Sequence, residues 1–215
     1  MGSIERTTLP GMEDRAIDLV LFDLGGVLIE LGGVASLQEM AAMVNEEEVW
    51  HRWLASPWVR RFERGDCSAS EFSVGAVAEW GLAISPERFL DIFRRWPIGP
   101  FDGAPELIAE VRRSVPIGCL SNTNTLHWEY QSAQWSMLGA FDFKFLSFEL
   151  GLVKPDQEMF RHVADRLPVS PNRVLYLDDV ALNSDAARSF GFRSEQVRGI
   201  DEVRRTLLQY GLIAD

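Results

Sequence analysis

The sequence predicts an α/β fold, a Rossmann-like parallel sheet with helices on both faces, with a small α-helical cap inserted after the first strand. Short apolar runs bounded by glycine or polar residues are typical of buried strands. Four such runs occur, at residues 17–22, 115–120, 143–146 and 173–177. Apolar residues at helical spacing lie between these strands or after the last of them, at residues 105–113, 155–167, 183–190 and 201–210. Strands that alternate with helices indicate a parallel sheet.

Residues 31–98 interrupt this alternation and look mostly helical. Apolar spacing predicts helices over 34–44, 46–54 and 70–80, the last opened by Ser70 as a cap. We therefore expect an α/β core formed by residues 15–30 and 99–215, with 31–98 as a helical cap over the strand ends. Residues 1–14 show no periodicity and are interpreted as a flexible N-terminal tail.

Composition excludes several classes of protein. The 215-residue chain has a formal net charge of −11, whereas a nucleic-acid binder is expected to present a basic surface. No apolar stretch approaches the roughly 18 residues of a membrane span, and the N-terminus lacks the apolar segment of a secretory signal. We expect a cytoplasmic protein with no nucleic-acid or membrane partner. Its oligomeric state is left open.

Polar side chains follow three of the predicted strands. Asp23 comes after the first strand, Ser121 after the second, and Asp178 and Asp179 after the fourth. Ligands of parallel α/β sheets bind outside the carboxyl ends of the strands. The three groups are therefore expected to converge on one site.

These residue types suit phosphoryl transfer, which needs a nucleophile, a cation, donors for phosphate oxygens and carboxylates for a metal. Asp23 lies on a glycine-rich turn that a ligand can approach closely. Ser121 and Asn122 offer a hydroxyl and an amide, and Lys154 offers a positive charge. Asp178 and Asp179 offer the oxygen ligands that Mg²⁺ prefers.

Four segments in order carry a resemblance to a known family: Phe22-Asp23-Leu24-Gly25-Gly26-Val27-Leu28, Ser121-Asn122, Lys154-Pro155, and Leu177-Asp178-Asp179 with Asn183. Over about residues 17–198 the chain resembles the haloacid dehalogenase (HAD) superfamily, and the place of the insert resembles its C1 cap class. It is most similar to sugar-phosphate phosphatases with an Asp-Leu-Gly-Asn first motif and to the phosphatase domain of soluble epoxide hydrolase.

The resemblance implies a magnesium-dependent phosphatase that hydrolyses a small phosphorylated metabolite through an aspartyl-phosphate. It implies Asp23 as nucleophile and metal ligand, with the Gly25 carbonyl as a second ligand. The third ligand is one of Asp178 and Asp179; alignment with the superfamily favours Asp179, with Asp178 behind it. The phosphate-binding residues are Ser121, Asn122, Gly25 and Lys154, and Lys154 also neutralises the nucleophile.

One position departs from the pattern of the superfamily. Its phosphatases usually carry an aspartate two residues after the nucleophile as general acid and base, and here that position is Gly25. Losing a positioned acid typically costs about 10²–10⁴-fold in rate. His127 is a candidate substitute, although a structural histidine is the simpler interpretation. His127, Trp58 and Arg61 are also possible substrate contacts, although aromatic residues at helical spacing are more often core.

Two other functions stay open. A 2-haloacid dehalogenase would use Asp23 to displace halide, which needs no proton, but it needs no metal either, and the Asp178-Asp179 pair argues for one. A HAD-fold binding or regulatory protein with weak turnover would also tolerate Gly25.

Overall fold

The computed structural model describes residues 16–42 and 45–214, so the tail predicted over residues 1–14 lies outside the described residues. At the centre is a five-stranded sheet in the order β5-β4-β1-β6-β7, in which each neighbouring pair is parallel. Its strands are β1 (Leu19–Phe22), β4 (Ile117–Ser121), β5 (Phe143–Leu146), β6 (Val174–Asp178) and β7 (Arg193–Gln196). The predicted α/β fold class is confirmed, and the carboxyl end of β1 lies between those of β4 and β6.

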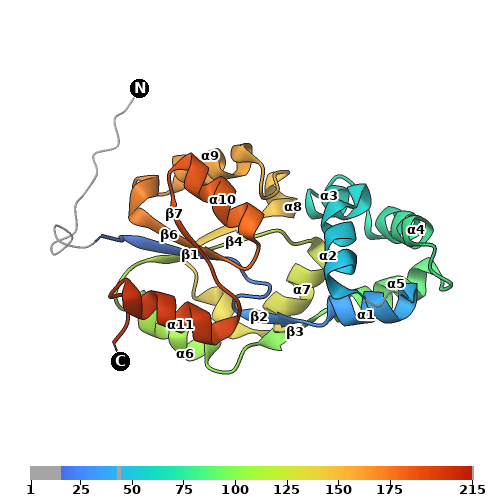
Figure 1. Cartoon of the computed structure of the whole chain (residues 1–215), viewed down its shortest axis with the longest axis horizontal. Helices are drawn as coiled ribbons and strands as arrows, with labels where there is room; N and C mark the ends of the chain where they lie inside the picture. The colour runs from blue at the N-terminus through green and yellow to red at the C-terminus, as the bar shows by residue number, and fades with distance from the viewer. Residues whose placement is uncertain (1–15, 43–44, 215) are drawn as a thin grey trace.

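Helices cover both faces of this sheet (Figure 1). They are α6 (Ala104–Arg112), α9 (Gln157–Arg166), α10 (Ala181–Phe190) and α11 (Gly199–Gln209). Val20 and Phe22 of β1 belong to an apolar cluster with α6 and α11, whereas Leu19 and Leu21 belong to a second cluster with α9 and α10. Because β1 is buried on both sides, its sequence is a continuous apolar run rather than an alternating one.

Within the described residues, five helices lie between two short strands that pair antiparallel. The elements are β2 (Ile29–Leu31), α1 (Gly33–Ala41), α2 (Glu46–Ala55), α3 (Pro57–Glu63), α4 (Ala69–Trp80), α5 (Pro86–Phe93) and β3 (Pro97–Pro100). We call α1–α5 the helical insert. It has its own aromatic-rich cluster, which includes Trp53, Phe72 and Phe93. Figure 1 shows the insert at one end of the molecule, beyond β2 and β3.

Several local predictions need correction. Ser68, not Ser70, caps α4: its hydroxyl accepts from the backbone of Glu71, and the Glu71 carboxylate returns to the backbone of Ser68. The helix expected over 34–44 ends at Ala41, and residues 43–44 lie outside the described residues. Helices α3 and α5 were not predicted because each offers only about two turns of apolar spacing.

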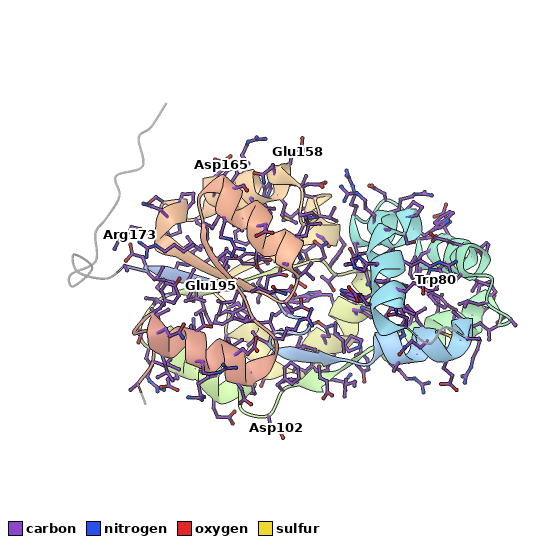
Figure 2. All side chains as sticks on the ribbon, in the orientation of Figure 1. Trp80, Asp102, Glu158, Asp165, Arg173 and Glu195 are labelled. Atoms are coloured by element: carbon purple, nitrogen blue, oxygen red, sulfur yellow. The ribbon has the colours of Figure 1, made fainter. Side chains whose placement is uncertain are left out.

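Large apolar side chains lie inside the molecule and charged side chains on its surface, as the residues labelled in Figure 2 illustrate. Trp80 lies among the helices of the insert, whereas Glu158 and Asp165 point away from α9 into solvent. Among residues 16–42 and 45–214, no helix combines the length and the apolar character that a bilayer crossing needs.

Candidate active site

Asp23 lies directly after β1, where its backbone N–H donates to the carbonyl of Leu177 in β6 at 2.8 Å. The chain then turns at Gly26, whose φ of +70° is left-handed. A Cβ on Gly26 would lie 2.5 Å from a carboxylate oxygen of Asp179. The absence of a side chain at this position therefore lets the loop after β1 lie against the acidic end of β6.

This contact predicts the effect of Gly26→Ala. The left-handed backbone costs a non-glycine residue about 1–2 kcal/mol, and the added methyl displaces Asp179 as well. We expect a lower Tm and a several-fold higher Mg²⁺ concentration for half-maximal activity. Gly81→Ala is the matched control, because Gly81 has a similar φ of +63° with no atom within 4 Å of an added Cβ. An equal Mg²⁺ requirement in both variants would contradict the contact.

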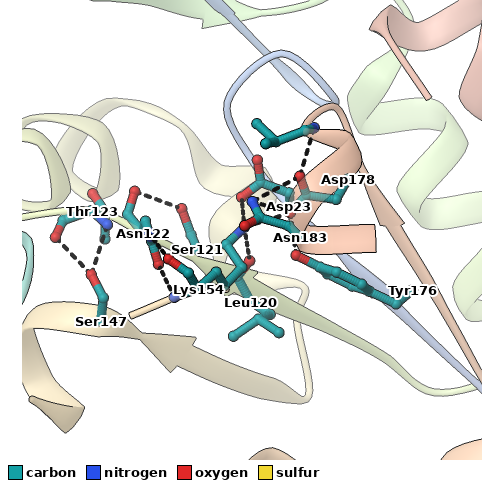
Figure 3. Close-up of polar contacts among 11 residues, drawn as sticks. Asp23, Leu120, Ser121, Asn122, Thr123, Ser147, Lys154, Tyr176, Asp178 and Asn183 are labelled. Atoms are coloured by element: carbon teal, nitrogen blue, oxygen red, sulfur yellow. Dashed lines mark hydrogen bonds and ion pairs between the residues drawn. The ribbon is translucent and has the colours of Figure 1, made fainter. Parts of the chain in front are cut away.

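Lys154 joins the two acidic strand ends. Its side chain is 2% exposed, and Nζ donates to Asp23 at 2.8 Å, to Asp178 at 2.7 Å and to the carbonyl of Leu120 at 3.0 Å (Figure 3). Burial alone would lower the pKa of Lys154, but the charges of Asp178 and Asp23 outweigh it and raise that pKa. The buried ammonium stays charged and compensates both carboxylates.

Asp178 is fully buried, and both of its carboxylate oxygens are engaged. One oxygen accepts from the backbone N–H of Val180 at 2.8 Å and the other from Lys154, while the Asn183 amide lies 3.1 and 3.2 Å from the two. The Tyr176 hydroxyl also donates to this carboxylate. The sequence does not indicate this role of Tyr176, because a tyrosine inside an apolar strand is typical of the hydrophobic core. Asp178 therefore connects Lys154, Asn183 and the backbone of the loop after β6.

Three carboxylates gather at this point. Asp23, Asp178 and Asp179 each place one oxygen within 4.8 Å of the others. Burial raises the pKa of Asp23 to about 6 and that of Asp179 to about 7, and neighbouring negative charges add to both increases. A divalent cation would remove this repulsion, and an all-oxygen donor set suits Mg²⁺. The site therefore fits the predicted cofactor.

Asn122 follows β4 and clamps the loop that carries Lys154. Its side-chain oxygen accepts from the Lys154 N–H at 2.8 Å, and its amide donates to the Lys154 carbonyl at 3.0 Å. Ser121, the last residue of β4, lies beside Asn122 on the wall of the same cavity. The second and third motifs are thereby held side by side.

The core and the helical insert enclose this cavity together. From the core come Asp23, Gly25, Ser121, Asn122, Lys154, Asp179 and Asn183, and from the insert and its junction come Trp50, Trp53, Glu63, Phe93 and Trp96. Trp58 and Arg61 are not in this wall. Trp58 packs against Gly75 of α4, and the Arg61 guanidinium lies 4.8 Å from the centre of the Trp58 ring.

His127, in α7 (Thr125–Gln134), also lines the cavity. Its Nε2 is 2.7 Å from the carbonyl of Phe93, so that nitrogen carries the proton and donates it to the insert. Nδ1 faces the Asn124 amide at 3.2 Å and accepts from it. Burial lowers the pKa of His127 to about 4. A neutral imidazole whose proton is already committed to a carbonyl is poorly suited to act as an acid.

Glu63 lines the cavity but was not a candidate from sequence. It is the last residue of α3, and burial raises its pKa to about 7. A glutamate among arginines at a helix end is typical of a solvated surface, so only the fold reveals its position over the strand ends.

The family model for haloacid dehalogenase-like hydrolases matches residues 17–191, which include every core residue of the cavity named above. The chain belongs to this family.

Two curated relatives of this haloacid dehalogenase-like hydrolase are named phosphatases. D-ribitol-5-phosphate phosphatase of Bacteroides thetaiotaomicron is 24% identical over 189 residues, covering 82% of this chain and 90% of the relative. Phosphatase MT3486 of Mycobacterium tuberculosis is 28% identical, covering 93% of this chain and 98% of the relative. The HAD family enzyme bt-2542 of B. thetaiotaomicron, in complex with magnesium and inorganic phosphate, has the same fold, with a TM-score of 0.69 at 21% identity over 85% of this chain and 94% of that chain.

Proposed function

We propose that this hydrolase is a magnesium-dependent phosphatase that hydrolyses a small phosphorylated metabolite through an aspartyl-phosphate on Asp23. The observation that carries the proposal is the position of the Asp23 carboxylate, hydrogen-bonded to Lys154 and gathered with Asp178 and Asp179. The phosphatase names of the two relatives support it. A cytoplasmic location stays a prediction.

The contacts of Asp178 and Lys154 support the proposed roles, and the family resemblance supplies that of the Gly25 carbonyl. Asp23, the Gly25 carbonyl and Asp179 hold Mg²⁺, while Asp178, with both oxygens engaged, orients Lys154 and the loop after β6. When bound, Mg²⁺ offsets the charge of the phosphoryl oxygens. Lys154 keeps the Asp23 carboxylate ionised and compensates the incoming phosphate. The Ser121 hydroxyl and the Asn122 backbone bind phosphate oxygens, and the helical insert is the cap that covers the ester.

Metal removal tests the cofactor. We expect EDTA to stop phosphate release and Mg²⁺ to restore it. Because Asp23 and Asp179 must lose protons to bind metal, and their pKa values are raised to about 6 and about 7, apparent Mg²⁺ affinity should rise with pH across this interval. Isothermal titration with Mg²⁺ in buffers of different ionisation enthalpy measures the affinity and the protons released. Activity that persists in excess chelator would contradict the metal assignment.

The same assay distinguishes the alternatives. A panel of sugar phosphates, an aryl phosphate and a 2-haloacid separates phosphate release from halide release. Halide displacement needs no metal, so it gives no reason for three carboxylates to gather here. Turnover of no ester, with Mg²⁺ still bound, would favour a binding or regulatory protein.

A further inference from the structure

The position of the usual general acid carries no side chain and borders an apolar residue. Gly25 has no side chain, and a Cβ built on it would lie 2.8 Å from a methyl carbon of Leu31. The end of the Leu31 side chain, from β2, therefore lies beside Gly25, and a larger residue at this position would require Leu31 to shift. Proton transfer needs another group on the wall of the cavity.

We propose that Glu63 of the helical insert is the general acid and base of this site. The inference rests on the proposed phosphatase function and adds to it a catalytic residue supplied by the insert. Glu63 lines the cavity together with Asp23, Ser121, Lys154 and Asp179. Asn122, whose side chain is hydrogen-bonded to the backbone of Lys154, lines the same cavity.

Helix α3 fixes Glu63 in this place. The helix begins at Pro57, behind Ser56, whose hydroxyl accepts from the backbone of Val59. It ends at Glu63, and two residues later Gly65 has a φ of +74° and would place an added Cβ 2.7 Å from the carbonyl of Phe148 in α8 (Ser147–Leu150). The end of α3 thus contacts the core directly.

One turn earlier, Arg60 forms an ion pair with Asp156 of the core. Glu63 lies between these two contacts and forms part of the cavity wall on the side of the insert.

The surroundings of Glu63 suit proton transfer near neutral pH. Its pKa is raised to about 7, because the effects of burial and of the Asp23 charge together exceed the opposing effects of Lys154, Arg60 and Asn122. A general acid works best when its pKa lies near the operating pH. His127, the other titratable candidate, has its proton committed to Phe93 and a pKa of about 4.

Glu63 gives up a proton in the first step of the proposed reaction and regains one in the second. A carboxylate oxygen of Asp23 attacks phosphorus, the bond from phosphorus to the ester oxygen breaks, and protonated Glu63 gives its proton to the departing oxygen, which leaves as an alcohol. Glu63 is then a carboxylate. It takes a proton from the water that attacks the phosphorus of the aspartyl-phosphate, which releases inorganic phosphate, restores Asp23 and reprotonates Glu63.

Glu63→Gln tests the proposal, with single-turnover rates measured on an alkyl phosphate and on an aryl phosphate with a good leaving group. We expect a loss of about 10²–10⁴-fold on the alkyl ester and a much smaller loss on the aryl ester, which departs without a proton. In the wild type, alkyl-ester cleavage should fall as pH rises through about 7, because Glu63 loses its proton. The variant should lack this decrease.

Two further variants separate catalysis from structure. Glu47→Gln, an exposed glutamate of α2, should behave as wild type on both esters. Gly25→Asp in the Glu63→Gln background should restore alkyl-ester cleavage, since Gly25 has an ordinary φ and the clash involves only the end of the Leu31 side chain. The Tm of Glu63→Gln shows whether the variant is folded. We expect no decrease, because the glutamine amide has the same shape as the carboxyl group and is neutral, and burial already disfavours the anion.

Equal losses on the two esters, or an unchanged pH profile in Glu63→Gln, would overturn the role of Glu63 while leaving the phosphatase proposal intact. If wild-type protein releases phosphate from no ester while binding Mg²⁺, the phosphatase proposal fails, and the role of Glu63 fails with it.

Discussion

Asp23→Asn should reduce phosphate release by at least about 10⁴-fold, the scale on which loss of a catalytic nucleophile acts. An amide is not a nucleophile toward phosphorus, and it removes one anionic ligand from the group of three carboxylates. The measurement is single-turnover hydrolysis of a radiolabelled aryl phosphate, followed by acid quenching. Wild-type protein should retain acid-stable, hydroxylamine-labile label, and the variant should retain none.

Asp165→Asn provides the matched control, because Asp165 is an exposed aspartate of α9 that points away from the core. It should keep wild-type turnover and labelling. Near-normal turnover in Asp23→Asn would remove the central assignment. Labelling of Asp23→Asn at wild-type level would place the phosphoryl group on another residue.

Lys154→Met should lower both the activity and the stability of the protein. Activity should fall by at least about 10²–10³-fold, the range for removing one preorganised electrostatic partner. Stability in EDTA should fall by about 3–5 kcal/mol, because Asp23 and Asp178 stay buried without their cation. For a chain of this length that corresponds to a Tm decrease of roughly 6–20 °C.

The sign of the pH dependence follows from the charges. Lys154 opposes the increase in the pKa of Asp23, so without Lys154 the folded-state pKa of Asp23 rises further above its unfolded value. The stability deficit is therefore present at neutral pH and shrinks as pH falls and Asp23 becomes protonated. Mg²⁺ should recover part of the Tm. Lys144→Met on the exposed edge strand β5 is the control. A Tm difference between the two variants that does not depend on pH would contradict the electrostatic origin.

The core of the fold could be predicted because its strands are buried on both faces. Runs such as Leu19–Phe22 and Val174–Asp178 have no polar face to confuse the pattern. β7 was missed for the opposite reason: Arg193–Gln196 is a polar edge strand whose pairing with β6 depends on the backbone. β2 and β3 were missed because each is short and is defined by its partner rather than by its own sequence.

The site divides in a similar way. Asp23, Ser121 and Asp179 could be found because strand ends on one edge of a parallel sheet meet, so position in the chain determines position in space. For residues of the helical insert, position in the chain does not determine which of them face the cavity. Trp58 and Arg61 were expected near substrate and instead pack on α4 and on each other, whereas Glu63 needed the docking of α3 to be recognised.

The antiparallel pairing of β2 with β3 has an evolutionary consequence. The chain leaves the core at Leu31 and returns at Pro97, which are register partners. Closing a long excursion between fixed neighbouring points costs only about 0.6 kcal/mol more for each doubling of its length. Inserts of different size and sequence are therefore readily exchanged on such a base during divergence. With Glu63 of the insert as the proton donor, each exchange of the insert also replaces a catalytic residue. A new insert must then supply both the substrate preference and the proton donor.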